Sequence, residues 1–369
     1  MTVRCNNFDS IRLIAALTVI LSHTVPLSYG NNERELIWRL SHGQTTAGTI
    51  AVIVFFAMSG YLITESFQRS RSARAFVLAR ALRLLPALAV VLLLLALAVG
   101  PMFSSLPAGS YFRTPAVYTF ILRNLIFRYI DNLPGVFQSN PYPGVVDGSI
   151  ATLKYEAECY LIVLGLGIAG LLGRWISASI YGAALVAICV LPHASNVNLI
   201  AVFLGGAVIN LFRPRLSIWP AGICLAGWAA SLVFGQELLA SALFGPYLAI
   251  YCALSPSVRL PNLARFGDLS YGVYIFAFPV QQIIVNVHAG AVSWWMNFCL
   301  ATAVAMMLAL VSWHAIEAPS LRLKARLVGR TARDVVQRTA ARPGLPGLIV
   351  HSGLQHEALP CASASHESS

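Results

Sequence analysis

Arg12 and His23 lie in the first apolar stretch of the chain with ten residues between them. Eleven steps of about 1.5 Å place the imidazole about 16 Å above the guanidinium, and at about 3.6 residues per turn both side chains share one helix face. A titratable His deep in hydrocarbon is costly and usually functional, and it can act as a general base. The pair predicts a channel with a cationic entrance and a base at its end. The alternative is a His bonded to a neighbouring helix and an Arg that snorkels to the headgroups.

A second candidate site is Arg80 and Arg83, which end the basic stretch QRSRSARAFVLARALRLLP at residues 68–86. At i and i+3 the two side chains share a helix face, and guanidinium groups suit phosphate oxygens. We therefore expect them to bind a phosphorylated ligand at the inner mouth. The alternative is an ordinary basic inner loop that meets anionic lipid.

The third candidate lies in DGSIATLKYEAECYL, where Lys154, Glu156 and Glu158 begin an apolar run. These groups could bind or polarise hydroxyl groups, or form an ion-pair girdle at the membrane interface. The two Glu residues point about 200° apart on a helix, so only one can face a cavity. We expect Glu156, which shares a face with Tyr160, to act at the site. Glu158 is expected nearer the headgroups as a lesser substrate contact.

Two further candidate substrate contacts are Tyr160, beside Glu156, and Tyr271, in the aromatic and kinked segment SYGVYIFAFPVQQ. The alternative is that this segment only packs against neighbouring helices, which is the more common role of such segments. Glu317 closes the last apolar run, with Arg322 within reach as an ion-pair partner. Ser59, Gly60 and Tyr61 predict close packing of the second apolar helix.

The elements that position these residues follow from composition. Of 369 residues, 57% are apolar and 11% are charged, and the mean hydropathy is +0.72. Soluble domains carry about 25% charged residues, so the chain is expected to be an all-α, polytopic membrane helix bundle. The net charge of +11 then indicates topology rather than nucleic-acid binding. Seven cysteines without short paired spacing predict neither a metal site nor a disulfide framework.

Ten apolar segments have close to the roughly 20 residues that cross a bilayer. They are expected at residues 11–29, 47–64, 84–103, 150–172, 175–193, 195–212, 217–234, 238–254, 268–289 and 294–316. An eleventh segment, 115–130, is shorter and carries two Arg residues, so it is expected to lie at the interface or to re-enter the membrane.

Charge sets the orientation. With ten spans and a cytoplasmic N-terminus, 19 of the 25 Lys and Arg residues fall on the inner side and 6 on the outer side. An extra span at 115–130 would turn the basic C-terminal segment outward. Both termini are therefore expected in the cytoplasm, with residues 104–149 outside. After a membrane domain at 1–325, we expect a basic cytoplasmic helix at 326–342 and a disordered tail at 343–369.

Read in order, these segments resemble the acyltransferase-3 family, integral membrane enzymes that O-acetylate bacterial surface glycans. FDSIRLIAALTVILSH resembles the family's opening motif through Arg12 and His23, VFFAMSGYLIT its second-span motif, and RALRLLPAL its paired arginines. DGSIATLKYEAECYL, SYGVYIFAFPVQQ and HAIEAPSLRLK resemble later motifs, so the resemblance covers about residues 6–325. Two departures are Ala151, where the family usually has Trp, and Ala277, where many members have a second His.

The resemblance implies an acyltransferase of the bacterial inner membrane that uses cytoplasmic acyl-CoA, acetyl-CoA in particular, as a co-substrate without a bound cofactor. The acceptor would be a hydroxyl of an extracytoplasmic or lipid-linked carbohydrate. Arg12, Arg80 and Arg83 would hold the CoA phosphates. His23 would act as general base or as a transient acyl carrier, with Glu156 as a second catalytic group, and the surrounding partner would be membrane lipid. The rival function is a transporter or flippase for a lipid-linked glycan, which would use the same polar groups without making bonds.

Overall fold

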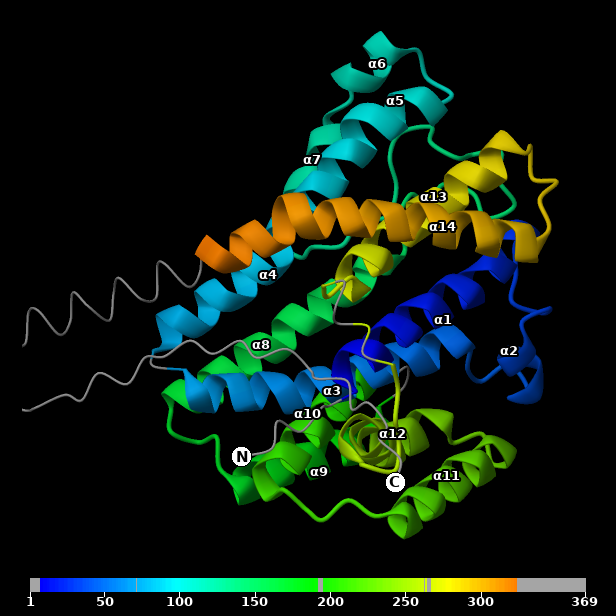
Figure 1. Ribbon diagram of the computed structural model, residues 1–369. Coiled ribbons are helices and arrows are strands. Elements are labelled where there is room, and N and C mark those ends of the chain that lie inside the picture. The colour runs from blue at the N-terminus through cyan, green and yellow to red at the C-terminus, as the bar shows by residue number, and fades with distance from the viewer. Residues whose placement is uncertain (1–6, 71, 192–194, 262, 264–266, 324–369) are drawn as a thin grey trace, which may run out of the picture. The chain divides into compact units, whose positions relative to one another are not determined.

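The computed structural model describes residues 7–70, 72–191, 195–261, 263 and 267–323, all within one compact unit that ends at residue 325 (Figure 1). These residues form helices joined by loops, and their β-structure is limited to two isolated bridges, Ser104 with Val136 and Asn132 with Val145. The helix and tail expected at 326–342 and 343–369 lie outside the described residues.

Each expected span corresponds to a helix. The ten are α1 (Phe8–Tyr29), α3 (Ala47–Arg69), α4 (Ala73–Leu94), α8 (Leu153–Ile168), α9 (Arg174–Val190), α10 (Ser195–Phe212), α11 (Ile218–Val233), α12 (Glu237–Leu254), α13 (Ser270–Val287) and α14 (Trp294–Ser312). Among the described helices, six are long and apolar enough to cross a membrane, namely α1, α3, α4, α12, α13 and α14 with their extensions. Three more, α9, α10 and α11, are apolar but shorter. The predicted all-helical, polytopic membrane bundle is confirmed.

Two spanning helices run on beyond their regular α-helical part. A π-helical turn, Leu95–Val99, joins α4 to α5 (Gly100–Phe103), and a second, Trp313–Glu317, follows α14. π-turns inside α-helices often occur at functional sites because they re-aim side chains. Here the second turn carries Glu317 into the centre of the protein, where 1% of the residue is exposed.

The segment 104–149 does not cross the bundle. It contains α6 (Ala108–Arg113) and α7 (Pro115–Leu125), which gather with α5 beside the end of α4 (Figure 1). Eleven residues of helix extend about 16 Å, which is too short for the hydrocarbon core. The Tyr111 hydroxyl fastens this segment to the π-turn after α4 by donating to the Ala96 carbonyl at 2.9 Å. The sequence-based prediction that 115–130 is not a span agrees with this length.

Glycine allows α3 and α10 to approach closely. A Cβ atom at Gly60 would lie 1.8 Å from the Phe203 carbonyl oxygen, and one at Gly206 would lie 2.0 Å from that of Ala57. Small residues permit such backbone contact between membrane helices. The close packing predicted around Gly60 is therefore present.

Helix α13 connects the parts that surround the site. It packs against α1 and α14, and the Gln281 amide nitrogen donates to the Ile20 carbonyl of α1 at 2.9 Å. The next residue, Gln282, donates to the carbonyls of Tyr142 and Val145 at 2.9 and 2.7 Å. These bonds hold the loop before α8 against the same end of α13 that contacts α1.

Candidate functional site

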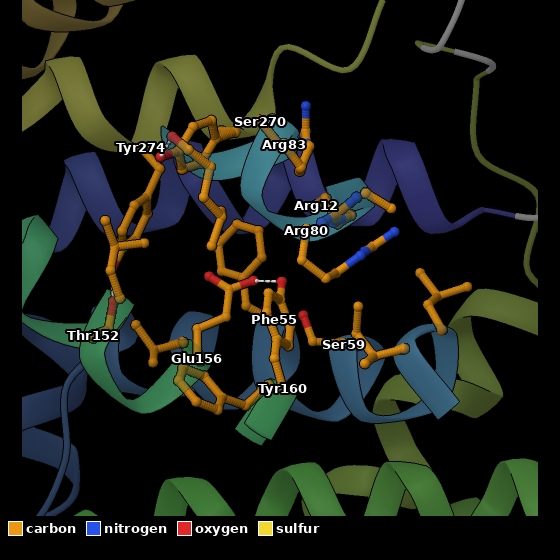
Figure 2. A pocket seen from close by; sticks show the side chains of 18 of the residues that line it. Arg12, Phe55, Ser59, Arg80, Arg83, Thr152, Glu156, Tyr160, Ser270 and Tyr274 are labelled. Carbon is orange, nitrogen blue, oxygen red and sulfur yellow. Dashed lines mark hydrogen bonds between the residues drawn. The ribbon is translucent and has the colours of Figure 1, made fainter. Parts of the chain in front are cut away.

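A cavity of about 250 Å³ lies among α1, α3, α4, α8 and α13 (Figure 2). Its wall combines apolar side chains such as Phe55 with a few converging polar groups, as is usual for ligand sites. It brings together six of the predicted site residues from four separate segments: Arg12, Arg80, Arg83, Glu156, Tyr160 and Tyr271.

Arg83 is fully engaged by the protein. Its guanidinium donates to Asp268 Oδ2 at 2.6 Å and to Glu317 Oε2 at 2.8 Å, and it lies 5.4 Å from the centre of the Tyr271 ring. Arg12 donates to the same Asp268 oxygen at 3.1 Å. Two arginines and two carboxylates from four segments thus form one network, in which Arg83 is the most central cation.

Asp268 is the group that the sequence analysis missed. It lies in the loop just before α13, and its second oxygen accepts from the Ser270 hydroxyl at 2.6 Å. Burial alone would raise the pKa of Asp268, but Arg12, Arg83 and the bonds from Ser270 outweigh burial and lower it to about 2. One signal was present in the sequence, because Asp268 is the sole acidic residue between positions 238 and 316.

Glu317 also has a partner that its neighbours in sequence did not indicate. Instead of pairing with Arg322, five residues away, it accepts from Arg83 on α4 and from the Ser312 hydroxyl at 3.1 Å. The π-turn directs the carboxylate inward, so the long-range partner replaces the local one.

Arg80 differs from the other two arginines. Within the described part of the chain it has no carboxylate partner, and its Nε is buried without a hydrogen bond. Its guanidinium lies 5.9 Å from the centre of the Tyr160 ring, which supplies only a weak cation–π contact. Arg80 is therefore the arginine of this cavity whose charge the described structure leaves least compensated.

Glu156 and Glu158 lie on different faces of α8, as their spacing predicted. Glu156 lines the cavity and accepts a short hydrogen bond from the Tyr160 hydroxyl (Figure 2). Glu158 is not among the lining residues; it lies 3.8 Å from Lys154, with 41% of its side chain exposed. The carboxylate that matches the family motif is thus placed with the arginines.

His23 lies outside the lining of the cavity. Its ring meets Phe278 edge to face, with 5.3 Å between the ring centres, and its Nδ1 is buried without a hydrogen-bond partner among the described residues. The cavity ends one turn of α13 earlier, at Tyr274, whose hydroxyl shares a 2.7 Å hydrogen bond with Thr152. The predicted base and the predicted phosphate-binding residues therefore occupy neighbouring levels of the same bundle.

Comparison with known proteins identifies the chain. The model of the acyltransferase-3 family, described as an acyltransferase domain, matches residues 6–314. The chain belongs to this family. It is 28% identical over 338 residues to an O-acetyl transferase of Shigella phage Sf6, covering 85% of this chain and 95% of that protein. It is 27% identical over 364 residues to nodulation protein 10 of Rhizobium leguminosarum bv. viciae, covering 88% and 95%. No solved structure matches the chain significantly.

Membership confirms the family resemblance and shows that the protein is a membrane acyltransferase. An acyltransferase needs an acyl donor and an acceptor. The cationic cavity and the histidine beyond it are two separate places in the bundle. Their separation is the basis for assigning a site to the donor and a site to the acceptor.

Proposed function

We propose that this acyltransferase moves an acetyl group from cytoplasmic acetyl-CoA to a hydroxyl of an extracytoplasmic or lipid-linked carbohydrate. The observation that carries the proposal is the uncompensated Arg80 in a cavity that also holds Arg12 and Arg83. The printed name of the phage relative, an O-acetyl transferase, supports acetyl as the group transferred and oxygen as the acceptor atom.

The donor fits the cationic cavity on chemical grounds. CoA phosphates cannot enter hydrocarbon, whereas the thin pantetheine arm can extend between helices. Asp268 and Glu317 already neutralise much of the charge of Arg12 and Arg83. Arg80 is therefore assigned the main phosphate contact, and Arg83 holds α4 and α13 in the geometry that presents it. This side faces the cytoplasm in the orientation that the basic loops indicate.

The reaction would take place at His23. The imidazole takes the proton of the acceptor hydroxyl, and the oxygen forms a bond to the thioester carbonyl carbon. The carbon–sulfur bond breaks, and the CoA sulfur leaves with the proton returned by the imidazolium. The products are the acetyl ester and free CoA. In the acyl-carrier variant the imidazole nitrogen attacks the thioester carbonyl carbon, the carbon–sulfur bond breaks and the CoA thiolate leaves. The acceptor oxygen then bonds to the acetyl carbon, the carbon–nitrogen bond to the imidazole breaks, and the hydroxyl proton passes by way of the imidazole to the thiolate.

Glu156 and Tyr160 connect the donor cavity to this chemistry. The hydrogen bond between them holds the Tyr160 ring beneath Arg80. Glu156 would thereby position Arg80 and supply a negative charge that orients the entering thioester. Tyr271 supports Arg83 in the same way from α13. The thioester must pass the level of Thr152 and Tyr274 to reach His23.

The proposal is tested with purified protein in proteoliposomes that contain the glycolipid fraction of the source strain. Labelled acetyl-CoA should yield labelled ester and free CoA, with any CoA in excess of the ester matched by free acetate from hydrolysis. The rival function, a transporter or flippase for a lipid-linked glycan, predicts movement of the glycan across the bilayer without CoA release. That result would replace the enzyme assignment of the donor and acceptor.

A further inference from the structure

Phe278 is the meeting point of three segments on the outer side of the cavity. Its ring contacts His23 of α1, and the backbone of the outer loop approaches it at Gly148. A Cβ atom at Gly148 would lie 2.8 Å from Cε2 of Phe278, so glycine is what permits this approach. The residues on either side of Gly148 are Asp147 and Ser149.

Four residues that contact this ring, or lie close to it along the chain, carry a buried polar atom without a well-formed hydrogen bond among the described residues. These atoms are His23 Nδ1, Asp147 Oδ2, Ser149 Oγ and Gln281 Oε1. Three of the residues contact Phe278 or flank a residue that does, and Gln281 follows it by one turn of α13. We call these four residues the Phe278 cluster.

The local fold explains these atoms only in part, since the Asp147 carboxylate also interacts with the Ser149 hydroxyl and the Ile150 amide without well-formed hydrogen bonds. Asp147 Oδ1 accepts from the Ser149 amide at 2.9 Å, which shapes the turn before α8, while Oδ2 is left over. The Gln281 nitrogen binds Ile20, while its oxygen is left over. Asp147 and Gln281 are 0% exposed. Each unsatisfied buried group costs about 1 to 3 kcal/mol, so a cluster of them indicates a missing polar partner.

We infer that the Phe278 cluster is the subsite for the acceptor, in which Asp147 Oδ2 and Gln281 Oε1 bind hydroxyl groups beside the one that His23 deprotonates. This assignment rests on the proposed function. A polyhydroxylated sugar matches the cluster because neighbouring ring hydroxyls can each donate to one of these oxygens, while Ser149 can donate or accept. Phe278 offers the apolar surface against which the carbon–hydrogen side of a sugar ring can pack.

Two substitutions separate recognition of the acceptor from shaping of the turn. Asp147→Asn keeps an oxygen that accepts from the Ser149 amide. It replaces Oδ2 by an amide nitrogen, which can donate to a hydroxyl oxygen of the acceptor. Asp147→Ser keeps a side chain able to make the turn but removes the spare group. The matched control is Asp131→Ser, in the same outer loop.

The assay uses membranes from a strain that lacks the gene as the acceptor probe, with labelled acetyl-CoA as the donor. It measures the ratio of ester-linked to free acetate and the total CoA released. Asp147→Ser should lower the ratio about tenfold or more, with CoA release within about twofold of the unsubstituted protein. Asp147→Asn and Asp131→Ser should each stay within about threefold.

Three results would overturn the subsite. An unchanged ratio in Asp147→Ser would show that the spare oxygen binds only water. A parallel fall in ester and CoA release would show a structural role of the turn, and equal losses in Asp147→Ser and Asp131→Ser would show a general effect of the loop. Absence of CoA release by the unsubstituted protein is a different failure, because it contradicts the proposed function itself.

Discussion

The cationic cavity and the Phe278 cluster lie one helical turn apart on α13, yet they treat polar groups in opposite ways. In the cavity, Arg83 makes ion pairs with Asp268 and Glu317, and Arg80 alone is left uncompensated. In the cluster, every member carries a buried polar atom without a well-formed hydrogen bond among the described residues. In the proposed function, the cavity receives one anionic group at the arginine that its own ion pairs leave uncompensated. In the proposal above, hydroxyl groups of the acceptor make the hydrogen bonds that the cluster lacks.

The largest expected effect is at His23, which belongs to the cluster and is the proposed general base or acyl carrier. His23→Ala should lower acetyl transfer by about 10² to 10⁴-fold, because the general base or acyl carrier is lost. Insertion and expression should remain close to normal, since the imidazole makes a single ring contact. Steady-state transfer assays measure the loss. The matched control is His314→Ala, an exposed His bonded to its own helix, which should keep its rate.

A well-inserted His23→Ala protein with most of its activity would remove His23 from the mechanism. It would also mean that donor binding and the reaction are not separated along the bundle, because the cavity would then have to contain the reacting groups.

Arg80 and Arg83 test whether the cavity divides binding from support. Arg80→Ala should raise the KM for acetyl-CoA by about tenfold or more with little change in Tm, because a phosphate contact is lost and no buried partner is stranded. Arg80→Lys should restore part of the affinity, because Lys keeps the charge without the planar fork. Donor titrations with a thermal-melt assay measure both quantities.

Arg83→Ala should instead destabilise the protein by about 3 to 5 kcal/mol, because it leaves buried carboxylates unpaired. Glu317 is 1% exposed, so water cannot replace the lost cation. A stable Arg83→Ala protein whose sole defect is a raised KM for acetyl-CoA would reverse the roles assigned to the two arginines.

Glu156 and Glu158 give a smaller effect on one helix. Glu156→Gln should lower the transfer rate by about tenfold, since the group that holds Tyr160 beneath Arg80 loses its charge. Glu158→Gln should stay within about twofold, because its pair with Lys154 is solvent-exposed. The measurement compares the acetyl-transfer rates of the two variants at equal expression. Comparable losses in both variants would show that the wrong face of α8 has been assigned to the site.

Asp268→Asn should have the smallest effect on activity, with a loss of stability that is present at neutral pH and disappears in acid. The pKa of Asp268 is lowered in the folded protein, so its contribution to stability, about 2 kcal/mol, is present above pH 4 and is lost as the pH falls through 4 towards 2. Melting temperatures between pH 6 and 2 should fall less steeply for Asp268→Asn than for the unsubstituted protein. Parallel curves would mean that Asp268 does not stabilise the network through its charge.

The sequence predicted most of this arrangement and missed its long-range pairs. Apolar runs and charge placed the ten helices, and helical spacing placed Glu156 and Tyr160 on the same face, where the structure has them. The partner of Arg83 could not be predicted, because Asp268 and Glu317 lie 185 and 234 residues away along the chain. The spacing of Arg12 and His23 aligned them on one helix, but it did not reveal that the cavity lined by Arg12, Thr152 and Tyr274 does not include His23.

The central claim, transfer from a cytoplasmic donor to an outer acceptor, is tested most directly by sidedness. Inverted membrane vesicles, whose cytoplasmic face is outward, and right-side-out vesicles from the same cells receive labelled acetyl-CoA, which cannot cross the bilayer. Labelled ester is expected in the lumen of the inverted vesicles, and almost none in the right-side-out vesicles. Labelling that is equal in both preparations, or confined to the right-side-out vesicles, would contradict the assignment of the Arg80 cavity as the donor site.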